Sequence, residues 1–214
     1  MKVGIIGSGA VGQTLAKAFK SEGYEVMLGT RNTAKEEVVK FNAETGISTG
    51  TFEDTAKFGG IIVISTKGDA AEEALKLAGI ENLDGKLVID TTNPIAAMPP
   101  TNGVLHFTTS LEWSMMEQLQ KIAPNAKFVK AFNSVGNTLM YKPVLTGGTP
   151  SMFICGNDEA AKQTVREILT AFGWETEDQG TAEAARAIEP LCMLWCIHGF
   201  LKNDWMHAYK VLRP

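Results

Sequence analysis

The chain has 214 residues, of which 44% are hydrophobic and 21% charged, with a formal net charge of −4. This composition is typical of a globular protein, and its mild acidity disfavours a nucleic-acid partner. The longest apolar run, Leu191 to Leu201, has 11 residues and is too short to span a membrane. Because a strand is expected at the N-terminus in place of a secretory leader, and three cysteines form no disulfide framework, we expect a cytoplasmic protein.

Short apolar strands alternate with helical patterns over the first two thirds of the chain. Alternation of this kind indicates βαβ units with right-handed crossovers and a parallel sheet. Strands are expected at 2–7, 24–29, 60–66, 85–94 and 126–133. Helices are expected from about residue 10 to Gly23, at 33–44, at 69–79, and on the stripe Leu111, Met115, Leu119 and Ile122.

The later part of the chain changes character after Asn133. Residues 134–150 are rich in turn residues and are expected to link two parts. Strands are expected at 151–156 and 174–180, with a helix between them whose N-cap is Asn157. From Thr181 only helical patterns remain, and Pro190 is expected in the first turn of the last helix.

The first strand is followed by a glycine motif, Gly7, Gly9 and Gly12, in the arrangement G-x-G-x-x-G. This motif is weak alone, but here it lies between an expected strand and an expected helix. One glycine permits a tight turn, one lets the backbone approach a pyrophosphate, and one lets helix and strand pack closely. We therefore predict a dinucleotide phosphate site formed by Gly7, Ser8, Gly9, Ala10, Val11 and Gly12, although a ligand-free glycine turn would show the same pattern.

The motif and the alternating pattern together favour an α/β fold, doubly wound and of Rossmann type, with a mostly parallel sheet and a small helical C-terminal part. The Rossmann domain is predicted at 1–180, with its main part at 1–133 and an added β-α-β at 151–178. The helical C-terminal part is predicted at 181–214.

The end of the second strand predicts which dinucleotide binds. Enzymes that use NAD commonly carry an acidic residue about 20 residues after the glycines, where it accepts hydrogen bonds from the ribose 2′-hydroxyl. Here Thr30 stands 18 residues after Gly12 and is followed by Arg31 and Asn32, with Lys35 nearby. A guanidinium matches a 2′-phosphate that a carboxylate would repel. These residues favour NADP(H), the alternative being that Arg31 is a solvated surface residue.

With these residues in view, the chain resembles the NADPH-dependent deazaflavin-coenzyme reductase family and is similar to the NADPH domain of the transmembrane metalloreductases. The resemblance rests on "GIIGSGAVGQTLA", "GTRN" with Lys35, "LVIDTTNP", "VKAFN" and "ICGNDEA". It implies NADP(H) as cofactor and a flavin or deazaflavin as co-substrate. It also implies cofactor contacts at the ends of later strands, from Ser65, Thr66, Lys67, Asn93, Pro94, Ala131, Phe132 and Asn133.

Two of these positions carry an alternative reading, and one segment departs from the family. Asn93 and Asn133 can also serve only to shape turns. In "STKGDA" the residues Lys67 and Asp69 stand where the family shows an apolar residue and Pro, which leaves the second substrate open. Asp90 is expected to accept hydrogen bonds from neighbouring backbone rather than to do chemistry.

Hydride transfer between a nicotinamide and a flavin-like ring requires that the rings be held close together and dry, and needs no acid or base from the protein. No catalytic residue is assigned here. His106 could line a substrate pocket, and His198 is expected in the core. Cys192 and Cys196 lack a further metal ligand, so buried thiols are the better interpretation and no metal is expected.

The last helix is apolar on nearly all sides, so it is expected to be buried. It can pack in the core, cover a substrate pocket with Trp195 and Phe200, or form a homodimer through the C-terminal helices. The leading hypothesis is an NADPH-dependent oxidoreductase whose partner is a small-molecule hydride acceptor, with no nucleic-acid or membrane partner. The alternatives are an NADPH-dependent reductase of a small carbonyl or imine, and a non-catalytic NADP(H) sensor.

Overall fold

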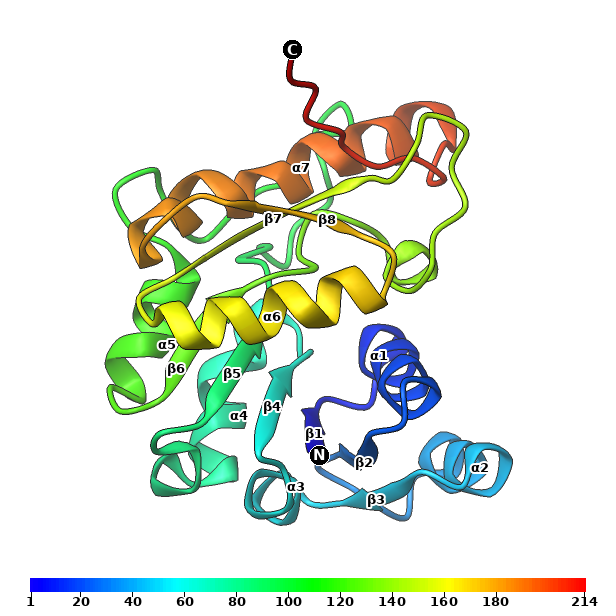
Figure 1. Ribbon diagram of the computed structural model, residues 1–214, viewed down its shortest axis with the longest axis vertical. Helices are drawn as coiled ribbons and strands as arrows, with labels where there is room; N and C mark the ends of the chain where they lie inside the picture. The colour runs from blue at the N-terminus through cyan, green and yellow to red at the C-terminus, as the bar shows by residue number, and fades with distance from the viewer.

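The computed structural model describes residues 1–214, which build one eight-stranded sheet in the order β3-β2-β1-β4-β5-β6-β7-β8 (Figure 1). The strands are β1 Lys2–Ile6, β2 Glu25–Gly29, β3 Ser48–Gly50, β4 Ile61–Ile64, β5 Leu87–Asp90, β6 Lys127–Lys130, β7 Ser151–Gly156 and β8 Glu175–Asp178. The helices are α1 Ala10–Ser21, α2 Glu36–Thr45, α3 Phe52–Phe58, α4 Ala71–Ala78, α5 Met115–Ile122, α6 Glu159–Ala171 and α7 Ala185–Lys202.

All neighbouring strands are parallel except β6 and β7, which are antiparallel. Strand β1 lies between β2 and β4, so the chain leaves β1 in one direction and later returns on its other side. Open sheets of this type bind ligands at the carboxyl ends of the strands on either side of such a reversal. The doubly wound Rossmann-type fold with a mostly parallel sheet and a helical C-terminal part is thus confirmed.

Side chains on each strand alternate between two hydrophobic cores, one on each face of the sheet. Ile5 and Val63 point into a core shared with α1, α2 and α6. Ile6 and Ile64 point into a second core shared with α3, α4 and α5 and with the beginning of α7. Because both faces are covered, the central strands have no solvated side, which explains their nearly continuous apolar sequences.

Three local features differ from the sequence prediction. Strand β3 and helix α3 were not expected, because the seven residues of α3 are fewer than the roughly 11 to 18 needed to show helical periodicity. The N-cap of α6 is Asp158, whose Oδ1 accepts from the Ala161 N–H, whereas Asn157 Oδ1 accepts from the Ala182 N–H. Leu111 lies outside α5, which begins only at Met115, and its side chain is exposed.

Helix α7 also differs from the prediction. Pro190 lies inside the helix rather than in its first turn, since the helix already begins at Ala185. Only one face is buried, with Leu194 54% and Phe200 45% exposed, and His198 is exposed rather than in the core. The homodimer expected through this helix stays a prediction. No helix combines the length and the apolarity needed to cross a bilayer.

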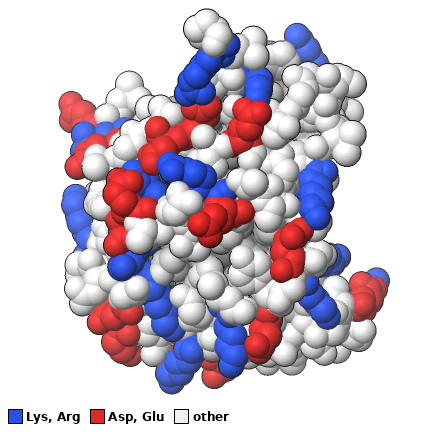
Figure 2. All heavy atoms as spheres, in the orientation of Figure 1, with Lys and Arg blue, Asp and Glu red and all other residues white.

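The C-terminal segment returns along the sheet after α7 and ends near the top of the view in Figure 1. Its Tyr209 carbonyl accepts a 2.8 Å hydrogen bond from the Ser151 N–H on β7. The Arg213 guanidinium makes a bidentate ion pair with the buried Glu177 carboxylate on β8. Elsewhere on this face acidic and basic side chains are interspersed (Figure 2). The ion pair between Arg213 and Glu177 therefore fixes the C-terminal segment to β8, the edge strand of the sheet.

The aromatic side chain of Phe172 is a sensitive point of the first core. It is fully buried and packs edge-on against Phe19 and Tyr141, with ring centroids 5.0 and 5.1 Å away. Phe172→Ala should lower the free energy of unfolding by about 3–5 kcal/mol, because it leaves a cavity among aromatic rings. Urea denaturation measures this loss. The control Val144→Ala, at a side chain 94% exposed, should change it by less than about 0.5 kcal/mol.

Candidate functional site

The loop from β1 into α1 has the geometry that the three glycines predicted. Gly7 adopts φ +124°, a conformation that side chains rarely tolerate. A Cβ on Gly12 would lie 1.9 Å from the Gly7 carbonyl oxygen, so only glycine lets the helix approach so closely. A Cβ on Gly9 would meet nothing within 4 Å, and no side chain caps the start of α1. The uncapped helix start faces open space, where its N–H groups and dipole favour an anion.

The end of β2 forms the next edge of the same cleft. Thr30 is buried, and its hydroxyl oxygen accepts a 3.2 Å hydrogen bond from the Ser8 hydroxyl, which joins this edge to the glycine loop. Asn32 Oδ1 accepts from the Ala34 N–H, and Lys35 is paired with Glu37 at 2.6 Å. Arg31 is exposed and takes part in no ion pair. Of the two basic side chains at this edge, Lys35 has an acidic partner and Arg31 has none.

These elements enclose a cleft of about 620 Å³ beside the β1–β4 reversal. Residues expected from the sequence account for most of its lining: Gly7, Ser8, Gly9, Ala10, Val11, Thr30, Arg31, Asn32, Lys35, Ser65, Thr66 and Lys67. Sequence reasoning missed the wall formed by α2, α3, α4 and the turn before α4, which contributes Glu37, Phe52, Ala70, Glu73, Ala74 and Leu77. Leu77 lies outside the buried stripe of α4 formed by Ala74, Leu75 and Ala78, and a large apolar residue out of that helical pattern is the sequence signal that could have identified the wall.

The carboxyl ends of β5 and β6 bring together two amide side chains that are 40 residues apart in sequence. Asn133 Nδ2 donates to Asn93 Oδ1 at 3.1 Å and to the Ile188 carbonyl of α7 at 3.0 Å, and Asn93 Nδ2 donates to the Asn133 carbonyl at 2.8 Å. Two buried acceptors nearby have no partner, Asn133 Oδ1 and Thr66 Oγ1. Since buried polar atoms are nearly always hydrogen-bonded, these two atoms indicate where a ligand would supply the missing donors.

Not all predicted residues at these strand ends can use their side chains. The side chains of Ala131 and Phe132 are fully buried, and Phe132 packs 5.9 Å from the Phe172 ring in the core. Phe132 adopts φ +62°, a strained conformation for a bulky residue that is typical of functional sites. Its part in the site is to turn the backbone so that Asn133 faces Asn93. Pro94 is buried as well.

Comparison with known proteins identifies the family. A family model described as "NADP oxidoreductase coenzyme F420-dependent" matches residues 2–94. A crystal structure from Arthrobacter sp. FB24, of a protein provisionally assigned as an F420-dependent NADP reductase, aligns with a TM-score of 0.92 and 31% identity over 100% of both chains. The chain belongs to the coenzyme F420-dependent NADP oxidoreductase family. It is an NADP-dependent oxidoreductase, as the sequence predicted.

More distant relatives include the metalloreductases. The chain is 28% identical to metalloreductase STEAP3 of Rattus norvegicus over 192 residues, which are 89% of this chain and 36% of the relative. It is also 28% identical to human metalloreductase STEAP2 over 195 residues, 35% of that relative. The chain therefore spans about a third of the length of these curated relatives.

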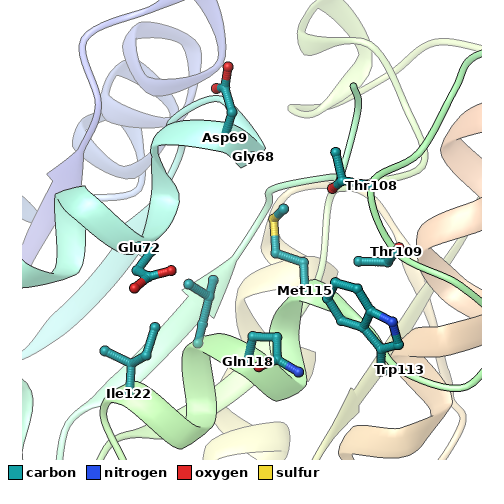
Figure 3. Close-up of a pocket in the computed structure, with 10 residues that line it drawn as sticks. Gly68, Asp69, Glu72, Thr108, Thr109, Trp113, Met115, Gln118 and Ile122 are labelled. Carbon is teal, nitrogen blue, oxygen red and sulfur yellow. The ribbon is translucent and has the colours of Figure 1, made fainter. Parts of the chain in front are cut away.

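A second groove, of about 680 Å³, lies on the other side of the turn that follows β4 (Figure 3). Lys67 of this turn lines the cleft beside the β1–β4 reversal, which we call the cofactor cleft. Asp69 lines the second groove. Figure 3 shows Asp69 and Glu72 on one side of the groove and Trp113 and Met115 on the other. The groove has no basic residue in its lining, so its charged groups are both acidic.

The groove and the cofactor cleft are close neighbours in the structure. A Cβ on Gly68, which lines the groove, would lie 2.0 Å from the Asn93 carbonyl oxygen and 2.9 Å from Met115 Cε. The turn after β4 is thus packed directly against the amide pair. His106 lines neither space, and its Nε2 lies 2.9 Å from the Thr101 hydroxyl.

The uncommitted guanidinium at the end of β2 yields a direct test of cofactor choice. Arg31→Ala should weaken NADPH binding roughly 10- to 150-fold, because a charge-assisted bidentate contact to a phosphate is lost. NADH binding should barely change. Fluorescence titration of both nucleotides measures the two affinities, and Lys40→Ala on the exposed side of α2 is the control. Equal losses for NADPH and NADH would refute the assignment of Arg31 to the 2′-phosphate.

Proposed function

We propose that this protein transfers hydride between NADPH and the ring of a flavin or deazaflavin coenzyme. The observation that carries the proposal is the cleft with an uncapped helix start at one end and the unpaired Arg31 beside the end of β2. The name of the relative from Arthrobacter sp. FB24, with which the chain shares its full length, supports a deazaflavin as acceptor.

Each part of the dinucleotide has a matching group in the chain. The start of α1 would hold the pyrophosphate, and Thr30, Arg31, Asn32 and Lys35 would surround the 2′-phosphate. The wall of α3 and α4 presents Phe52, Ala74 and Leu77 as an apolar surface for the adenine. Residues at the far strand ends would hold the nicotinamide: Ser65, Thr66, Lys67, Asn93, Pro94, Ala131, Phe132 and Asn133.

The far end of the site fits the nicotinamide and asks for no acid or base. The unpartnered oxygens of Thr66 and Asn133 can accept from the carboxamide N–H groups of that ring. When bound, the cofactor supplies the hydride. Apart from Lys67, the polar side chains gathered there are hydroxyls and amides, which keep their protons at neutral pH and serve to orient the ring. This suits transfer to a flat conjugated acceptor, where positioning is the main contribution of the protein.

An acceptor assay tests the proposed function. The protein is mixed with NADPH and, separately, with coenzyme F420, FMN, FAD, riboflavin or a quinone, and loss of the near-ultraviolet absorbance of reduced nicotinamide is followed. We expect turnover with a deazaflavin or flavin and slower turnover with NADH than with NADPH. Tight NADPH binding with no acceptor consumed would contradict the proposal. It would support the alternative of a non-catalytic NADP(H) sensor.

A second candidate is favoured by the acid-lined groove. A cationic imine accepts hydride without a proton donor, and its charge suits Asp69 and Glu72 beside the aromatic face of Trp113. The phosphate of a flavin nucleotide would instead be repelled there. The charge of the groove therefore favours a cationic imine over an anionic flavin nucleotide.

Substitution of the groove carboxylates separates these candidates. Under the imine hypothesis, Asp69→Asn with Glu72→Gln should raise KM for a cationic cyclic imine about 5- to 50-fold, because two favourable charge contacts are lost. Under the flavin hypothesis the double variant should retain or improve activity with FMN. The matched control is Glu81→Gln, an acidic residue outside the groove.

A further inference from the structure

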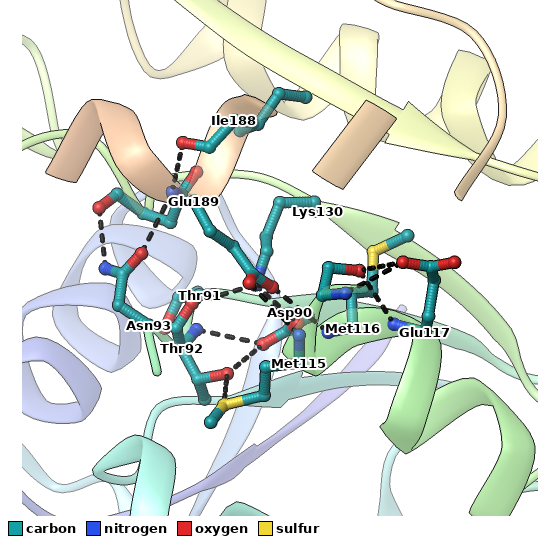
Figure 4. A network of polar contacts seen from close by, with 12 residues as sticks. Asp90, Thr91, Thr92, Asn93, Met115, Met116, Glu117, Lys130, Ile188 and Glu189 are labelled. Atoms are coloured by element: carbon teal, nitrogen blue, oxygen red, sulfur yellow. Dashed lines mark hydrogen bonds and ion pairs between the residues drawn. The ribbon is translucent and has the colours of Figure 1, made fainter. Parts of the chain in front are cut away.

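A cluster of three charged side chains is buried beneath the amide pair of the site. Lys130 and Asp90 have no exposed side-chain surface, and Glu189 of α7 is 1% exposed. Lys130 Nζ lies 2.8 Å from Asp90 Oδ2 and 3.0 Å from Glu189 Oε1 (Figure 4). We call these three residues the buried charge cluster.

Both carboxylates of the cluster are surrounded by hydrogen-bond donors. Glu189 accepts from the N–H groups of Met115 and Met116 at the start of α5, each at 3.0 Å, and from the Lys130 ammonium. Asp90 accepts from the Thr92 N–H at 2.9 Å, from the Thr92 hydroxyl at 2.7 Å and from the ammonium. Backbone N–H and ammonium groups can only donate, so they favour the charged form of each carboxyl.

Counted by formal charge, the cluster has two carboxylates and one ammonium, a net charge of −1. No other ion pair in the structure has both partners at 1% exposure or less. Water cannot screen this charge as it screens a surface group. A buried excess charge acts over a longer range than an exposed one, so its position relative to the reacting ring matters.

The cluster is connected to the nicotinamide end of the site through short contacts. The Lys130 ammonium also donates a 2.8 Å hydrogen bond to the carbonyl oxygen of Thr92, the residue directly before Asn93. On α7 the carbonyl of Ile188, next to Glu189, accepts from Asn133 Nδ2 at 3.0 Å. The cluster is thus joined to both members of the amide pair through the neighbouring backbone of Thr92 and Ile188.

We propose that the buried charge cluster sets the redox balance of the bound nicotinamide, by stabilising its oxidised, positively charged form. Hydride transfer moves two electrons and one proton from NADPH to the flavin or deazaflavin ring and leaves a nicotinamide with one positive charge. A fixed negative charge nearby favours that product and so makes bound NADPH a stronger hydride donor. The inference rests on the proposed function, because it requires the nicotinamide to lie at Asn93 and Asn133.

The expected size of the effect follows from Coulomb's law. At an effective dielectric constant of about 20, one unit charge acting over about 10 Å changes an equilibrium constant roughly ten-fold. For a two-electron couple, a ten-fold change corresponds to about 30 mV in potential. The dipole of α5 partly offsets the negative charge, but it is the same in the protein and its variants.

Neutralising one carboxylate tests the proposal through binding rather than turnover. In Glu189→Gln the net charge of the cluster becomes zero, so the ratio of the NADP⁺ and NADPH dissociation constants should rise roughly 3- to 20-fold. The potential of the bound couple should rise accordingly. Calorimetric titration of each nucleotide gives the ratio. Asp90→Asn should raise the same ratio of dissociation constants. It is measured in place of Glu189→Gln if the Glu189→Gln variant does not fold.

Two further variants separate charge from structure. Lys130→Met makes the cluster more negative. Where this variant folds, the ratio of the NADP⁺ and NADPH dissociation constants should fall. Glu177→Gln removes a buried carboxylate on β8, far from the site, and should lower stability without changing the ratio. Equal weakening of NADP⁺ and NADPH in Glu189→Gln and Asp90→Asn would overturn the inference and leave the cofactor assignment intact. If the unaltered protein bound neither nucleotide, the proposed function would fall, and the inference with it.

Discussion

The ion pairs of Lys130 connect the parts of this protein that form its site. Burial opposes the charge of this lysine, but the carboxylates of Asp90 and Glu189 hold its pKa above the usual value. Through these contacts β5, β6, α5 and α7 are fixed to one another, because a buried charge that loses a partner is strongly destabilising. Arg186 adds a second link between α7 and α5 through its hydrogen bonds to Glu117, which lower the pKa of that carboxyl to about 2.

Under the proposed function, recognition of the cofactor phosphates and transfer of the hydride take place at different positions along one edge of the sheet. The β1–β4 side holds groups suited to phosphates, an uncapped helix start and an exposed arginine. The β5–β6 side holds amides and hydroxyls, supported from below by buried charges. Exposed groups can exchange water for ligand at little cost, whereas buried groups keep a fixed geometry and a strong local field. Under the proposed function, cofactor choice and hydride transfer therefore depend on different residues.

Much of the fold and part of the site could be predicted from the sequence, and the errors have physical reasons. Gly7 and Gly12 lie where backbone geometry excludes other residues, so the glycine motif located the turn between β1 and α1. Helix α3 was too short to show periodicity, and with it the cleft wall at Phe52 was missed. Phe132 was expected at the cofactor, and because its side chain lies in the core, only its backbone is available to the site.

The sequence by itself determined the alternation of strands and helices, the glycine turn, and the Thr30–Arg31 edge that favours NADP(H). These features are local, since they depend on side-chain periodicity and on neighbours within a few residues. Only the tertiary structure decided that Asp90, Lys130 and Glu189 meet, and that Asn93 faces Asn133. Those residues come from separate elements, and whether charged side chains are buried together or solvated depends on how the whole sheet and α7 pack.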